Sequence, residues 1–217
     1  MPKTITVRGE GKLTVSPDTA EITMILRSKN KDYEKSTESA EKQLASVTEA
    51  LIGAGLGRDA LKTDSFSINS EYESESDGKG GYHSVLTGYV CVQNAHVELP
   101  LDTGLLSSVL SAVSGSSAEP EISVRFTVKD KAAVSEAVLR EVAVNARRRA
   151  EVIADASGVK LRSLLSVEYG AKTPALYSPT SFDAENRCMA LGSAPKMNFN
   201  PDEITVSDSA TFVWEID

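Results

Sequence analysis

The sequence contains few of the residues from which metal sites and disulfide frameworks are built. Its 217 residues include two cysteines and two histidines. Cys91 and Cys188 lie far apart, so neither a disulfide framework nor a cysteine-based metal site is indicated, and both are expected to be free thiols. His83 and His96 fall on one expected strand at an odd separation, which places them on opposite faces and prevents them from sharing a metal. We therefore expect no metal and no cofactor.

Long apolar runs and an excess of basic charge are also missing. No apolar run of about 18 residues occurs, so no membrane span is expected. The formal net charge is -8, which argues against nucleic acid as the main partner, because binding phosphates requires a basic surface. The first residues include no basic and apolar leader, so the protein is expected to be soluble and, as given, cytoplasmic. With 41% hydrophobic residues, the chain has enough apolar material for a proper core.

The segment from Ile122 to Glu168 has the clearest pattern and predicts a strand, a helix and a second strand. Apolar residues alternate over 122–128, and Asp130 follows at the position of a helix N-cap. Residues 131–156 contain no proline or glycine, and Gly158 supplies the stop. Spacings of four and three predict that the buried face of this helix consists of Leu139, Ala143, Ala146, Ala150 and Ile153.

The other elements follow from the same two periodicities and from the positions of glycine and proline. Because Asp208 interrupts the apolar row of the last strand, the start of that strand is expected to be exposed or bulged. In chain order, we predict a hairpin turning at Gly9-Glu10-Gly11, a strand over 20–26, a helix over 32–52, a strand over 61–72, a flexible acidic tip at 73–81, a long strand over 82–99 that bends at Gly88, a short helix capped by Asp102, and a final strand over 204–216.

These elements predict an α+β fold in which long, partly bent strands form a mostly antiparallel sheet with three helices packed on it. Ile22 and Ile122 begin similar strand, helix and strand segments, which suggests a pseudo-repeat of two βαβ units, although any α+β protein can show such a rhythm by chance. Residues 1–217 are expected to form a single domain. Its one long segment without a clear period, 171–200, contains prolines, aromatics and methionines and is expected to be an ordered loop.

Two glycine-rich or acidic motifs resemble ligand sites. The run from Gly53 to Gly57 resembles a dinucleotide-binding loop, but it follows a helix instead of preceding one. The favoured interpretation is therefore that these glycines end the helix. Glu73, Glu75, Asp77 and Gly78 resemble the start of a calcium loop. The twelfth position of that loop would be Ser84, which has no carboxylate, so a solvated acidic tip is favoured.

Three further groups contain residue types that can take part in catalysis, anion binding or oxidation. A catalytic role for His83 or His96 would need a nucleophile and an orienting group that the sequence does not reveal. The basic run Arg147-Arg148-Arg149 fans around a helix, with Arg147 placed to pair with Glu151, which favours a solvated or intersubunit face over an anion site. Cys188-Met189 would be oxidised if exposed, but an incidental role is favoured. We therefore predict no catalytic, cofactor-binding or metal-binding residues.

Motifs made of structural glycines, prolines and core positions occur in order at residues 5–11, 17–20, 62–68, 88–89, 143–161 and 201–207. In these stretches the chain resembles the SIMPL-domain family, which includes bacterial periplasmic immunogenic proteins and oxidative-stress defence proteins. The resemblance covers nearly the whole chain, and it implies an α+β fold with long strands and packed helices and, for some members, large ring-like or channel-like oligomers. No catalytic residues can be carried over from it. Many members carry an export signal, which this sequence is expected to lack.

From these observations we expect a non-enzymatic, self-assembling protein with a role linked to oxidative or envelope stress. A homo-oligomer is the expected partner. Two alternatives remain open: a module that binds a small ligand or a protein through the 171–200 loop, and a hydrolase that uses His83 or His96.

Overall fold

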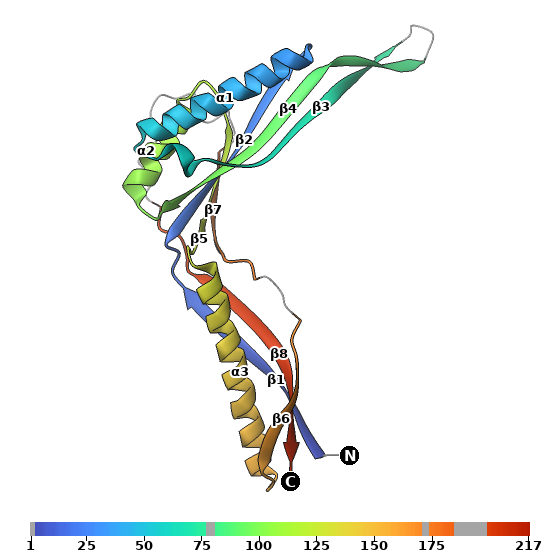
Figure 1. Ribbon diagram of the computed structural model, residues 1–217, viewed down its shortest axis with the longest axis vertical. Coiled ribbons are helices and arrows are strands. Elements are labelled where there is room, and N and C mark those ends of the chain that lie inside the picture. Colours follow the sequence, from blue (N-terminus) through green and yellow to red (C-terminus); the bar gives the residue numbers. More distant parts are fainter. Residues whose placement is uncertain (1–2, 77–80, 171–173, 185–198) are drawn as a thin grey trace. The chain divides into compact units, whose positions relative to one another are not determined.

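The computed structural model describes residues 3–76, 81–170, 174–184 and 199–217 (Figure 1). Within these residues there are three α-helices and eight strands, and the strands form two sheets. The expected α+β class is confirmed. By its contacts the chain divides into two compact units: unit 1 holds Met1–Asp18, Thr127–Pro179 and Pro201–Asp217, and unit 2 holds Thr19–Phe126 and Thr180–Asn200.

Unit 1 is built on a three-stranded antiparallel sheet in the order β1 (Lys3–Val15), β8 (Ile204–Ile216), β6 (Leu161–Glu168). Helix α3 (Lys131–Ala156) packs on one face of this sheet, over β1 and β8 (Figure 1). The alternation of apolar and polar residues in β1 and β8 supplies the buried face, which includes the stacked rings of Phe212 and Trp214.

The predicted hairpin at Gly9-Glu10-Gly11 is wrong. Strand β1 runs without a turn and pairs with β8 from Lys3 to Val15. Its glycines are needed for a different reason: a Cβ atom on Gly9 would lie 2.3 Å from the carbonyl oxygen of Val142, and one on Gly11 would lie 2.5 Å from that of Val138. The two glycines therefore let α3 lie closer to the strand than any side chain would allow.

The predicted buried face of α3 is also partly wrong. Ala146 and Ala150 are buried as expected, whereas Leu139 and Ile153 are 37% and 43% exposed. The buried row is Val138, Val142, Ala146, Ala150 and Ala154. Both rows have helical spacing, and the close approach at the two glycines selects the one that is built from alanine and valine. The ends of α3 are as predicted, since the Asp130 carboxylate accepts a 2.8 Å bond from the N–H of Ala133 and Gly158 has φ +69°.

Unit 2 contains the larger sheet, and two helices cover one of its faces. Helices α1 (Tyr33–Gly53) and α2 (Thr103–Ser114) shield a core whose largest fully buried side chains include Phe126, Ile22 and Leu106. Phe199 and Phe182 extend this core, with the Phe199 ring 5.7 Å from that of Phe126. The strand order is β3 (Lys62–Ser76), β4 (Tyr82–Pro100), β2 (Thr19–Asn30), β5 (Glu121–Thr127), β7 (Tyr177–Ala184).

The two segments that suggested a pseudo-repeat differ in the structure. Strands β2 and β3 are both antiparallel to β4, so β2, α1 and β3 form a crossover within one sheet. Strands β5 and β6, which flank α3, belong to different sheets. The two segments therefore share a rhythm of elements but not a common arrangement.

Three smaller predictions from the sequence also differ from the structure. The start of β8 is neither exposed nor bulged against β1, because Ile204 is fully buried and the register is continuous. The acidic stretch Glu73–Ser76 is the end of β3 and not a loop. The segment expected to be a loop at 171–200 contains strand β7, and residues 171–173 and 185–198 lie outside the described part. The bend expected at Gly88 coincides with a register shift opposite Glu71 and Tyr72.

Candidate functional site

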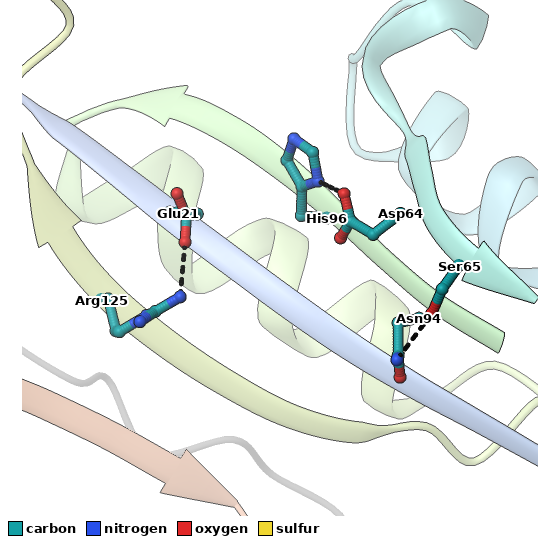
Figure 2. A network of polar contacts seen from close by, with 6 residues as sticks. All are labelled: Glu21, Asp64, Ser65, Asn94, His96 and Arg125. Atoms are coloured by element: carbon teal, nitrogen blue, oxygen red, sulfur yellow. Dashed lines mark hydrogen bonds and ion pairs between the residues drawn. The ribbon is translucent and has the colours of Figure 1, made fainter. Parts of the chain in front are cut away.

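Polar side chains gather on the face of the unit 2 sheet that α1 and α2 do not cover. Figure 2 shows three contacts there, which join β3 to β4 and β2 to β5. His96 Nδ1 lies 2.7 Å from Asp64 Oδ1. The other two contacts are a 2.9 Å hydrogen bond from the Asn94 amide to the Ser65 hydroxyl and a 3.0 Å ion pair between Arg125 and Glu21.

The contact between His96 and Asp64 is the arrangement closest to catalytic machinery. A carboxylate that orients a histidine is useful for catalysis only when the other ring nitrogen reaches a nucleophile or a substrate proton. Among the described residues, no hydroxyl or thiol is hydrogen-bonded to His96. The nearby Ser65 hydroxyl accepts its bond from Asn94. The pair therefore fastens the irregular start of β3 to β4, where Asp64 is the extra residue of a register shift.

His83, the second histidine, lies far along β4 and pairs in register with Glu75 on β3. The two histidines are not brought together. Within the described ranges, no group of three or more His, Cys, Asp and Glu side chains is placed to hold a metal.

Two further ion pairs lie on this face. Arg27 lies 3.0 Å from Glu121, and Lys29 forms an ion pair with Glu71. The hydrogen bond to Glu71 raises the pKa of Lys29 above its ordinary value. Both pairs tie β2 to another strand of the sheet, because Glu121 lies on β5 and Glu71 on β3.

The other sequence candidates have structural roles. The glycine run ends α1, with Gly55 at φ +94°, and does not precede a helix N-terminus. Arg147 pairs with Glu151 at 2.9 Å, as expected. Cys91 is a buried free thiol 3.1 Å from the hydroxyl of Ser36. Cys188, Asp77 and Gly78 lie outside the described residues, so the proposals that depend on them stay predictions.

The exposed edges of both sheets carry features that oppose pairing with another strand. On β1, the Arg149 guanidinium donates to the carbonyl oxygen of Arg8 at 2.8 Å, and the Asn145 side chain accepts from the N–H of Glu10 at 3.2 Å. Helix α3 thereby occupies backbone groups on the side of β1 that lacks a neighbour. Strands β3 and β6 each lie at an edge and have two register shifts against their neighbours, and edge strand β7 contains Pro179. The edges are therefore poor sites for strand addition.

An uncovered apolar surface lies instead on the hairpin formed by β3 and β4. Strand β2 ends at Asn30, opposite Tyr89, so the hairpin continues past it as a two-stranded arm (Figure 1). The register places four exposed side chains on the face of this hairpin that continues the α1 side of the sheet. We call these residues the aromatic face: Phe66 (50% exposed), Tyr72 (58%), Tyr82 (78%) and Leu86 (44%). Helix α1 packs on β2 and β4 and leaves this surface in water.

A second, smaller group of exposed apolar side chains lies on unit 1. Leu164 and Val167 pair in register with the core residues Trp214 and Phe212, so they share the α3 face of the sheet. Helix α3 lies over β1 and β8, and both β6 side chains remain exposed. Neither the aromatic face nor this group was predicted from the sequence, because its alternating pattern shows which side chains share a face but not whether a helix covers them.

Comparison with known proteins gives one family. A family model described as SIMPL, protein of unknown function (DUF541), matches residues 5–214. No curated protein matches the chain. None of the helices in the described part of the chain is both long enough and apolar enough to cross a membrane.

Proposed function

Because the chain belongs to the SIMPL family, whose description assigns no activity, we propose that this protein is non-enzymatic and assembles with copies of itself. The observation that carries the proposal is the uncovered aromatic face. A fully exposed aromatic side chain presents roughly 200 Å², so the exposed fractions of its four residues correspond to apolar surface on the order of 450 Å².

That area is large for a surface that stays in water. Each partner in a standard interface contributes about 800 Å², of which somewhat more than half is apolar. The aromatic face therefore supplies about the apolar share of one standard interface. Association through side chains also agrees with the protected sheet edges, which oppose association through backbone hydrogen bonds.

The polar network supports the non-enzymatic part of the proposal. His96 and Asp64 are hydrogen-bonded, but the neighbouring hydroxyl of Ser65 is bonded to Asn94 and not to the histidine. A hydrolase that uses His96 would need its nucleophile or its activated water on the other ring nitrogen. The replacements His83→Ala and His96→Ala are expected to leave assembly unchanged. A hydrolytic activity that disappears with either replacement would overturn the non-enzymatic assignment.

The binding-module alternative depends on the 171–200 segment, most of which lies outside the described residues. Deleting this segment separates the two functions: lost assembly would point to the segment as an interface, and intact assembly with lost partner binding would favour the module. The link to oxidative or envelope stress that the family resemblance implies remains a prediction.

The direct test is the molar mass in solution, measured by light scattering on a sizing column over a range of protein concentrations. A discrete mass that is a multiple of the 23.2 kDa chain supports self-assembly. A mass of one chain at every concentration overturns it.

A further inference from the structure

We infer that the aromatic face docks on the same face of a second copy of this chain, so that the two hairpins pack face to face. This inference rests on the proposed self-assembly and names its interface. The structure supports it through the distribution of charge on the hairpin, through its exposed apolar area and through the position of the arm in the sheet.

The two faces of the hairpin differ sharply in charge. Past the register shift at Tyr72, the cross-strand pairs on the aromatic side are Tyr72 with Leu86, Ser74 with Ser84 and Ser76 with Tyr82. With Phe66, Ile68 and Ser70 earlier on β3, none of the β3 and β4 side chains that the structure describes on this side is charged. The opposite side carries three carboxylates on alternate residues, Glu71, Glu73 and Glu75.

This distribution favours a second copy over partners of other chemistry. Two chains that each carry a net charge of -8 repel one another. The repulsion is weakest where an uncharged face meets an uncharged face and the carboxylates of both hairpins point outward into water. A basic partner would be drawn to the carboxylates on the other side, and an anionic membrane would be repelled by them.

Packing against a second copy would stabilise the two-stranded arm. A two-stranded hairpin is at best marginally stable in water, and the arm extends past the last residue of β2 that pairs with β4. At the base of the arm, the rings of Tyr33 and Tyr89 meet edge to face with centroids 5.5 Å apart, which fixes the hairpin to the start of α1. Stacking two such hairpins would form a two-layer packing with a spacing of about 10 Å between the layers, as in a β-sandwich.

The aromatic face and its area also suit an isologous contact. In a two-fold interface each copy contributes the same patch, so the patch must be compatible with itself. A surface of aromatic rings, one leucine and serine hydroxyls meets this condition, because none of its groups repels its own copy. Apolar area on the order of 450 Å² from each copy is the apolar share of a standard interface.

The test uses single cysteines on the two sides of the same strands, in the full chain with Cys188→Ser. Cys91 is 1% exposed and is kept. Ser70→Cys, Ser74→Cys and Ser84→Cys place a thiol on the aromatic side. Asn69→Cys, Glu73→Cys and Glu75→Cys are matched controls on the opposite side, one residue away from a test position. A bismaleimide that spans about 10 Å matches the spacing of two packed sheets.

We expect at least one thiol on the aromatic side to give covalent dimers in several-fold higher yield than every control. Equal yields from the two sides, or higher yields from the controls, overturn the inference. Tyr72→Ser is expected to lower the solution mass, whereas Glu73→Ser leaves it unchanged. If the unmodified protein is a single chain by light scattering, the proposed function fails as well. If it is oligomeric and Tyr72→Ser does not alter its mass, only this interface is wrong.

Discussion

Replacing Gly9 with alanine tests how the helix and sheet of unit 1 fit together. The added methyl group would meet the carbonyl oxygen of Val142 at 2.3 Å and the Cβ atom of Ala146 at 2.7 Å. The first distance is about 1 Å shorter than a normal carbon–oxygen contact of roughly 3.3 Å. Both contacts are with the body of helix α3, so no flexible side chain can move aside to relieve them.

Two effects of opposite sign decide how much Gly9→Ala changes the free energy of unfolding. Alanine restricts the unfolded chain more than glycine does, which by itself would stabilise the protein by about 0.4–1 kcal/mol. Forcing extra volume into a packed contact costs about 1–3 kcal/mol. The upper part of that range applies here, because the obstacle at Gly9 is helix backbone. We therefore expect Gly9→Ala to lower the free energy of unfolding of unit 1 by about 2 kcal/mol.

Trp214 is the only tryptophan of the chain and is buried in the core of unit 1, so its fluorescence reports on this unit during urea unfolding. With a urea dependence of about 2 kcal/mol per molar, the expected loss moves the midpoint down by about 1 M. Gly170→Ala is the matched control. It lies in the same unit, and apart from its chain neighbours no atom of the described residues lies within 4 Å of the position that its Cβ would take.

The control is expected to unfold at or slightly above the midpoint of the unmodified protein. If Gly9→Ala and Gly170→Ala gave the same midpoint, the close approach of α3 to β1 would not be the reason for the glycine.

Three further outcomes follow from single contacts. Asp130→Ala removes the N-cap of α3 and should cost about 1 kcal/mol in urea unfolding followed by Trp fluorescence; an unchanged midpoint would contradict that role. Replacing Asn145 and Arg149 together by alanine frees the backbone edge of β1, so we expect faster growth of thioflavin-positive aggregates than in the unmodified protein, and equal growth would show that the edge is not protected in this way. The hydrogen bond to Asp208 raises the pKa of Tyr169, so the stability from this contact is complete below the ordinary tyrosine pKa near 10 and is lost as the pH rises through the raised value. Asp208→Asn should lower that pKa in an ultraviolet titration, and an unchanged titration would exclude the contact.

Local chemistry explains why several elements could be read from the sequence. Asp102 and Asp130 cap helices as predicted because a carboxylate beside free backbone N–H groups acts within a few residues. The end of α3 at Gly158 depends on a left-handed backbone conformation that glycine adopts easily. Such signals need no knowledge of the rest of the chain.

The errors arose where a decision required a second element. The glycines at 9 and 11 are compatible with a turn, and the sequence alone cannot show that a helix from residues 131–156 lies against them. The two apolar rows on that helix have the same spacing, so periodicity alone could not choose between Ala154 and Ile153 as its buried end. For the same reason, the sequence alone could not show that no helix covers the aromatic face.

The sequence by itself determined the class of fold, the ends of the helices and the family, because these depend on periodicity, caps and motifs along the chain. It also determined that Phe66 and Tyr72 share one face of a strand, since side chains alternate along it. Only the tertiary structure decided that the first strand is continuous, that β5 and β6 belong to different sheets and that the aromatic face stays uncovered. These features depend on which distant segments meet, and burial is a property of that contact and not of the local pattern.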